Sequence, residues 1–194
     1  MIKRVLLSLA VVTILGLAQD ASAGIVTNGD FQTGTIFGWT DGGNLGWNTV
    51  GAGAGVGGSF GVSNGAVGSL STLSQTLATT PGGLYQIDFS IQNDGAGIFN
   101  VLFDGATVYS ELGLTHTYIG HSVFAFASGA STVLQLQSRD DPGFLQFDNV
   151  DVTAVPTAVP EPGSLTLVGL GAATLFGTVI ARRRKKNRAT DCQV

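Results

Sequence analysis

The sequence predicts an all-β fold, a jelly-roll β-sandwich that extends from residue 24 to residue 153. Three observations support this prediction. Residues 85–92 alternate strictly between apolar and polar side chains, as in a strand with one buried face. Asp104-Gly105 lies between two alternating runs and is typical of a tight hairpin turn. Residues 24–153 show no helical period, so a helical or mixed domain is not expected.

Further strands are expected wherever apolar residues recur two positions apart, because such residues point to the same face of a sheet. Residues 128–131 separate two of these groups and have the composition of a turn. Several short strands at this spacing favour a sandwich or jelly roll. The groups are Phe99, Val101 and Phe103; residues 107–109; Phe124 and Phe126; and Leu134 and Leu136.

The last expected strand changes parity along its length. Leu145 and Phe147 share one parity, whereas Val150 and Val152 have the other. A strand that keeps one face buried needs an extra residue to make that change. The sequence therefore predicts a β-bulge at Asp148-Asn149.

The first 23 residues predict a signal peptide. Lys3 and Arg4 precede an apolar run over residues 5–18, and Ala21-Ser22-Ala23 has the A-x-A form of a cleavage site. The run would form about 21 Å of helix, which is short for a bilayer core of roughly 30 Å and argues against a membrane anchor. Cleavage is expected after Ala23, so the mature chain is exported.

A second apolar run, residues 164–181, contains no charged side chain and predicts one transmembrane helix of about 27 Å. A basic cluster follows it, which predicts that residues 182–194 stay in the cytoplasm and that the domain lies outside. The prolines within residues 154–162 predict an extended linker between the domain and the membrane. The basic residues are Arg182, Arg183, Arg184, Lys185, Lys186 and Arg188.

The motif Val159-Pro160-Glu161-Pro162, the apolar span and the basic cluster occur in this order at the end of the chain. Residues 159–188 thus resemble the PEP-CTERM sorting domain of Gram-negative bacteria. The resemblance implies processing by an exosortase-type enzyme, a membrane protease-like protein, and an association with exopolysaccharide and biofilm. It implies inner-membrane anchoring first and release to the cell surface or matrix afterwards. One departure is that residues 189–194 follow the basic cluster.

Charge is distributed unevenly along the chain. Residues 24–160 contain ten acidic side chains and one basic side chain, Arg139, for a net charge of −9. A surface this acidic offers phosphates no basic path, which excludes nucleic acid as a partner. Cys192 is the only cysteine and lies in the predicted cytoplasmic tail, so no disulfide framework is expected.

No motif indicates catalysis. Residues 57–61 fit G-x-S-x-G, but they lie in a glycine-rich stretch with no helix after it. His116 and His121 have no pair of carboxylates near them in the sequence at metal-ligand spacing. Asp140-Asp141-Pro142-Gly143 is better explained as a turn than as the carboxylate pair of a glycoside hydrolase. We expect a protein that is not an enzyme.

The two ends of the domain carry a second resemblance. Asn28-Gly29-Asp30-Phe31-Gln32 and Gly38-Trp39 open it, and residues 147–152 close it. These segments resemble galactose-binding-like jelly rolls, a superfamily that includes many carbohydrate-binding modules. The resemblance covers residues 24–153 and rests on the short motifs at its ends.

The same resemblance implies a structural calcium ion between the opening motif and an acidic residue near the last strand. Position by position it indicates Gln32 and Asp148, with Asp30 as a third ligand. The family usually has a glutamate at the position of Gln32. The amide oxygen of Gln32 can bind calcium but brings no charge. Both a domain without a cofactor and one with calcium remain open.

Aromatic side chains are the usual platform for sugars, because a flat ring covers the apolar face of a pyranose. Trp47 lies in a polar, glycine-rich loop and is the better candidate, with Tyr118 as a weaker one. A Trp47 that folds back onto the core is the alternative. Trp39 is expected in the core.

Two functions fit these observations. The first is a surface-displayed, non-catalytic module that binds exopolysaccharide or another matrix carbohydrate. The second is a structural biofilm or matrix protein without a discrete ligand site. Both require the membrane and an exosortase-type enzyme as partners during sorting.

Overall fold

The computed structural model describes residues 23–95 and 97–156. The predicted signal peptide up to residue 22, with Ala21, lies outside this range. The sorting motif, the apolar span 164–181 and the basic tail also lie outside it, and the signal peptide, the membrane span and the cytoplasmic tail remain predictions. Within the described part of the chain, no helix is long and apolar enough to cross a membrane.

Strands dominate the described residues, and a single short 3-10 turn, η1 (Val56–Gly58), interrupts them. In chain order the strands are β1 (Thr40–Gly43), β2 (Asn48–Ala52), β3 (Phe60–Asn64), β4 (Ser71–Ala78), β5 (Leu84–Asp94), β6 (Ile98–Phe103), β7 (Ala106–Leu112), β8 (Thr115–Phe126), β9 (Ser131–Arg139) and β10 (Leu145–Ala154).

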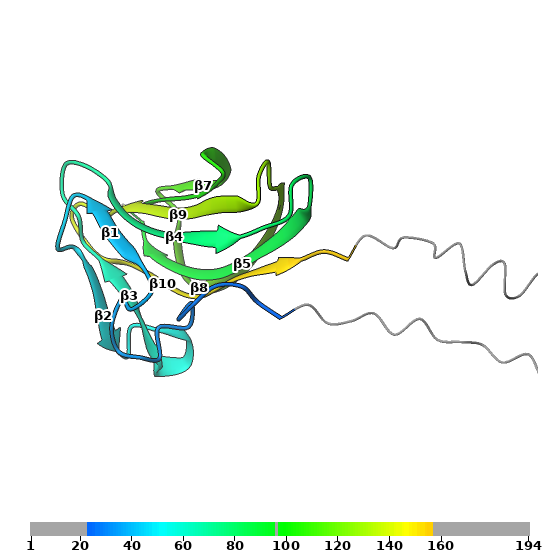
Figure 1. Ribbon diagram of the computed structural model, residues 1–194. Coiled ribbons are helices and arrows are strands. Elements are labelled where there is room, and N and C mark those ends of the chain that lie inside the picture. Colours follow the sequence, from blue (N-terminus) through cyan, green and yellow to red (C-terminus); the bar gives the residue numbers. More distant parts are fainter. Residues whose placement is uncertain (1–22, 96, 157–194) are drawn as a thin grey trace, which may run out of the picture. The chain divides into compact units, whose positions relative to one another are not determined.

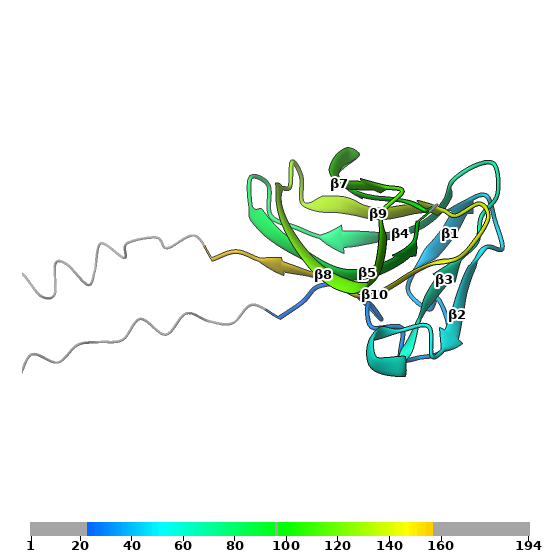
Figure 2. The ribbon, with the colours of Figure 1, turned by 180° about the vertical axis from the view of Figure 1, so that it is seen from behind.

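These strands form two antiparallel sheets of five strands each. The first sheet has the order β1-β4-β9-β6-β7, and the second has the order β2-β3-β10-β5-β8. Figure 1 shows β4 and β9 of the first sheet above β5 and β10 of the second, and Figure 2 shows the same two layers from behind. The predicted all-β jelly-roll sandwich is confirmed.

Aromatic rings from both sheets fill the space between them. The ring centroids of Phe89 and Phe99 are 5.7 Å apart, and Phe99 lies 5.3 Å from Phe147. All three side chains are buried, and full burial of such a side chain stabilises the fold by roughly 1.5–3 kcal/mol. Each sits on the inner face of a strand with period-two alternation, which is why the pattern predicted the sandwich.

The opening motif closes one side of this core. The ring of Phe31 stacks on Trp39 at 5.8 Å and meets Phe147 edge-on at 6.0 Å. The indole Nε1–H of Trp39 donates to the Asn28 carbonyl at 3.2 Å. Trp39 is therefore a core residue, as the sequence predicted.

The bulge in β10 is confirmed at its predicted position. Asp148 pairs with Ser90 of β5, whereas Asp151 pairs with Asp88, so three steps on β10 match two on β5. Asn149 has a φ of 53°, in the left-handed region that asparagine adopts more readily than most residues. The extra residue keeps the apolar side chains on both sides of the bulge in the core.

The hairpin between β6 and β7 also forms as predicted. Asp104 and Gly105 have φ values of 55° and 77°, and two positive values characterise a type I′ turn. In β8, by contrast, Phe124 and Phe126 face solvent. The smaller Val123 and Ala125 pack against the core instead.

The described domain is self-contained. The core described above lies wholly within residues 25–154, which belong to one compact unit. The beginning of the domain runs beside the end of β10, because the Ile25 N–H donates to the Val152 carbonyl at 2.9 Å. Phe144 lies at the opposite end of β10, eight residues before Val152 or about 26 Å along the strand.

Candidate functional site

A row of residues crosses the outer face of the second sheet at one end of the sandwich. Asn48 of β2 pairs with Asn64 of β3, and Asn64 also pairs with Leu145 of β10. These three residues are buried, so the positions next to them point to the opposite, outer face. The adjacent positions are Trp47, Gly65 and Phe144, which together we call the aromatic row.

Trp47 and Phe144 leave much of their rings in solvent, with exposed fractions of 39% and 59%. Gly65 separates them and allows Phe144 to lie across the sheet: a Cβ at Gly65 would come within 2.7 Å of the Phe144 ring. Two strand spacings, about 10 Å, separate the chains that carry the two rings. Both rings are therefore open to solvent at the same end of the second sheet.

Polar side chains occupy the next outward-facing row. Thr49 pairs with Ser63, Ser63 lies beside Gln146, and Gln146 pairs with Gln92. The Gln and Ser side chains are half-buried, and each amide or hydroxyl group can both donate and accept a hydrogen bond. A ligand that covers the aromatic row would meet these groups at its edge.

Hydrogen bonds from Asp41 and Asn44 fix the loop that carries Trp47. The Asp41 carboxylate accepts the Gly46 N–H at 3.3 Å and the Asn48 side-chain amide at 2.8 Å. Asn44 donates its side-chain N–H to the Val67 carbonyl at 2.9 Å, which ties the loop to the β3–β4 connection. Trp47 thus stands on a fixed loop and does not fold into the core.

A buried polar network lies directly under the row. Asn64 donates its amide to Asn48 Oδ1 at 2.9 Å and also bonds to the Ser71 hydroxyl. Ser71 Oγ donates to the Ser138 carbonyl at 3.2 Å. Because Ser71 and Ser138 belong to the other sheet, the network fixes the two sheets relative to each other beneath the platform.

Tyr118, the weaker predicted ligand residue, is engaged inside the protein. Its hydroxyl donates to the Ala54 carbonyl in the loop between β2 and β3. Burial raises the pKa of this hydroxyl, and the Asp148 carboxylate raises it further. Tyr118 therefore holds the loop over the sheet, and its hydroxyl is not free for a sugar.

Asp148, the predicted metal ligand, has a donor for each of its oxygens. Its exposed fraction is 1%. Oδ2 accepts the Val56 N–H at 2.9 Å and the Ser59 hydroxyl at 3.2 Å, and Oδ1 accepts the Asn149 N–H at 2.7 Å. The carboxylate acts as the anchor of the loop that contains η1.

Gln32 reaches the start of β3, which follows this loop, with its amide nitrogen. Nε2 donates to the Asp30 carbonyl at 2.7 Å and to the Phe60 carbonyl at 3.2 Å, and the exposed Asp30 carboxylate accepts the Gln32 N–H at 3.3 Å. The Gln32 NH₂ group therefore lies where a cation would have to approach the Asp30 and Phe60 carbonyl oxygens. Among the described residues, no three of the types His, Cys, Asp and Glu are placed to hold a metal ion. The arrangement as hydrogen-bonded does not fit calcium, which stays an untested prediction.

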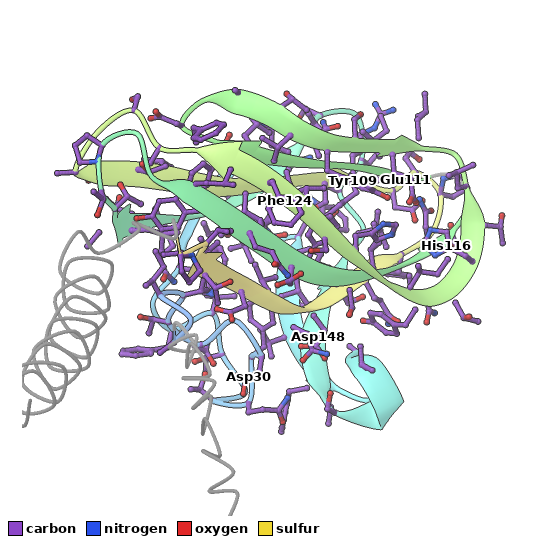
Figure 3. All side chains as sticks on the ribbon, turned by 90° about the vertical axis from the view of Figure 1, so that its right-hand side faces the viewer. Asp30, Tyr109, Glu111, His116, Phe124 and Asp148 are labelled. Atoms are coloured by element: carbon purple, nitrogen blue, oxygen red, sulfur yellow. The ribbon has the colours of Figure 1, made fainter. Side chains whose placement is uncertain are left out.

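A second polar cluster, which the sequence did not indicate, surrounds Glu111. This buried carboxylate accepts hydrogen bonds from Asn93 at 2.9 Å, His116 at 2.9 Å and Tyr109 at 2.8 Å. Burial alone would raise the pKa of Glu111, but these donors lower it on balance. Figure 3 shows Tyr109, Glu111 and His116 together on one side of the domain, apart from Asp30 and Asp148.

His116 fits this cluster in its charged form. Nε2 faces the Glu111 carboxylate and Nδ1 faces the Thr117 carbonyl, so both ring nitrogens have an acceptor. Burial lowers the pKa of His116, but these two contacts raise it above its ordinary value. His121 stacks on Phe89 at 5.4 Å, and burial lowers its pKa. The cluster links β5, β7 and β8 and is a structural network.

Comparisons with known proteins agree with the predicted sorting motif and with the predicted fold. Residues 158–185 match the PEP-CTERM protein-sorting motif. No curated protein sequence matches the chain.

The β-sandwich resembles several solved structures. TmCBM61, solved in complex with β-1,4-galactotriose, shares 14% identity over 69% of this chain and 100% of its own, with a TM-score of 0.58. The CBM22-1 xylan-binding domain of Paenibacillus barcinonensis Xyn10C shares 20% identity over 71% and 99%, with a TM-score of 0.54. The K3 adhesin domain of Lys-gingipain from Porphyromonas gingivalis shares 16% over 69% and 99%, with a TM-score of 0.53. The chain thus carries a PEP-CTERM sorting motif behind a β-sandwich with the fold of carbohydrate-binding modules.

Proposed function

We propose that the β-sandwich is a non-catalytic module that binds a polysaccharide of the cell envelope or matrix across the aromatic row. The proposal rests on the strand register: continued by one residue beyond β2, β3 and β10, it puts Trp47 and Phe144 on one face with Gly65 between them and amide and hydroxyl groups beside them. Stacked rings bind the apolar faces of sugars, and neighbouring polar groups fix their orientation.

Charge narrows the ligand class. The domain has a net charge of −9. An anionic polysaccharide would be repelled by this field, whereas a neutral one would not. We therefore propose a neutral glycan that lies on the outer face of the second sheet.

The position of the row suits a displayed module. Phe144 lies at one end of β10, and the chain continues from the other end toward the sorting motif. The motif implies export, membrane anchoring and processing by an exosortase-type enzyme. The ligand face then lies at the far end of the domain from the attachment point, where long polymers have access.

Affinity electrophoresis or calorimetry against a panel of neutral and acidic polysaccharides tests the proposal. Trp47→Ala and Phe144→Ala should each weaken binding of the neutral ligand by about tenfold or more, since one stacked ring contributes about 1–3 kcal/mol. Phe124→Ala is the matched control, because Phe124 is an equally exposed ring at the other end of the same sheet. Binding that survives both row variants would contradict the site, and no binding to any glycan would favour a structural matrix protein.

A further inference from the structure

An acidic pair lies next to the aromatic row. Asp94 is the last residue of β5, and Asp140 follows directly after β9. Burial, and after it the neighbouring Asp94 carboxyl group, raise the pKa of Asp140 to about 6, so the two carboxyl groups are neighbours. The Asp94 carboxylate also accepts the Phe144 N–H, so it contacts the turn that leads into β10. The predicted turn at residues 140–143 thus places two acceptor groups face to face.

Asp140 is buried without a donor. Its exposed fraction is 1%, and in the described part of the chain neither carboxylate oxygen receives a hydrogen bond from an N–H or O–H group. Its backbone is fixed, because the Asp140 N–H donates to the Ala66 carbonyl at 3.2 Å. A buried carboxylate in this state is strongly destabilising unless a positive charge or a proton accompanies it.

Asp148 provides an internal comparison. It is just as buried as Asp140, yet three protein donors surround it. Arg139, the neighbour of Asp140 in the chain and the only basic residue of the domain, directs its guanidinium to the Gly68 carbonyl at 3.2 Å. No basic side chain of the described domain therefore neutralises the Asp140 carboxylate, so a proton or a bound cation must do so.

We propose that Asp94 and Asp140 bind a divalent cation that prefers oxygen ligands, with calcium as the ion in an extracellular setting. Asp94 is exposed and gives the ion a route from solvent, while Asp140 supplies the buried charge. Across residues 23–95 and 97–156, no third side chain of the types His, Cys, Asp and Glu joins these two carboxylates as a metal ligand. Backbone carbonyl oxygens and water molecules therefore complete the coordination shell of the ion. Hard cations accept such mixed oxygen shells. This site is separate from Gln32 and Asp148.

Calcium binding by the full-length protein in detergent tests this proposal directly. Calorimetry should show one calcium per chain, and the melting temperature should be higher in calcium chloride than in EGTA. Asp94→Asn and Asp140→Asn should each raise the calcium Kd about tenfold or more, because each removes a charged ligand. Asp88→Asn is the matched control: Asp88 lies on the outer face of β5, where it accepts hydrogen bonds from Gln86, and its loss should leave the Kd unchanged.

Asp140→Asn also reports on folding. In EGTA this variant should melt at a higher temperature than the wild type, because the amide removes the buried charge and donates to Asp94. Absence of calcium heat and of a melting shift in the wild type would overturn the proposal and leave a shared proton between the two carboxyl groups. A calcium response that persists in both variants would overturn it as well. None of these measurements depends on whether the domain binds a glycan.

Discussion

Asp148→Asn distinguishes a structural anchor from a metal ligand. The carboxylate accepts hydrogen bonds from Val56, Ser59 and Asn149, two at Oδ2 and one at Oδ1. An asparagine side chain has one acceptor oxygen, so it can serve one side only. Its NH₂ group then faces an N–H on the other side, and one buried donor loses its acceptor.

The magnitude follows from this count. A buried donor without an acceptor costs about 1–3 kcal/mol, and the remaining bonds lose the added strength of a charged acceptor, about 1 kcal/mol more. The total is about 2–4 kcal/mol. In a domain of this size each kcal/mol lowers the melting temperature by about 3–5 °C, so the midpoint should fall by roughly 10 °C.

Thermal unfolding followed by circular dichroism, in calcium chloride and in EGTA, provides the assay. Since the oxygens of Asp148 are used by protein donors, the loss should be the same in both solutions. A cation at Asp94 and Asp140 is present in wild type and variant alike, so its contribution cancels. Asp30→Asn, at an exposed position, should change the midpoint by less than about 2 °C. A loss several degrees larger in calcium than in EGTA would show that Asp148 is a calcium ligand and refute the anchor.

Three further predictions concern other parts of the chain. Gln32→Glu should lower the melting temperature in EGTA, because a carboxylate then faces the Phe60 carbonyl, and calcium should raise its midpoint by more than it raises that of the wild type; an equal rise in both proteins would contradict this. Charged His116 pairs with Glu111 and stabilises the fold at low pH, and this stabilisation is lost as the pH rises through the raised pKa of His116. The free energies of unfolding of wild type and His116→Gln should therefore differ most near pH 5 and least near pH 9. Parallel profiles of stability against pH would exclude an ion pair between His116 and Glu111. Replacement of Pro160-Glu161-Pro162 by three alanines should leave unprocessed protein in the membrane fraction on immunoblots, and normal processing would reduce the motif to a linker.

The fold was predictable because its signals are local. Alternation over eight residues is sufficient to identify β5, and a single change of parity locates the bulge at Asp148. The facing of β8 was not predictable in this way. Alternation shows that two faces differ but does not say which is buried, and in β8 the large Phe124 and Phe126 are the outer ones.

The aromatic row was predictable only in part. Trp47 was indicated by its polar, glycine-rich loop, but Phe144 was not, because its role depends on the register that joins β3 to β10. The sequence signal for it was an aromatic residue between a turn and an apolar strand. Likewise, the sequence around Asp140 indicated an ordinary turn, because the burial of Asp140 and its proximity to Asp94 at the end of β5 depend on the tertiary fold.

The acidic pair and the aromatic row share one structural element, the turn that ends at Phe144. Asp94 contacts this turn through the Phe144 N–H, and Asp140 begins it. A cation between the two carboxylates would therefore hold Phe144 in place before a glycan arrives, which lowers the entropy lost on binding. Linkage then requires the reverse effect as well: the glycan must raise the affinity for calcium by the same factor. Calorimetry of glycan binding in calcium and in EGTA measures the first factor, and calcium titration with and without glycan measures the second. Equal factors greater than one support coupling through the turn, whereas a factor of one in both titrations shows that the two sites act independently.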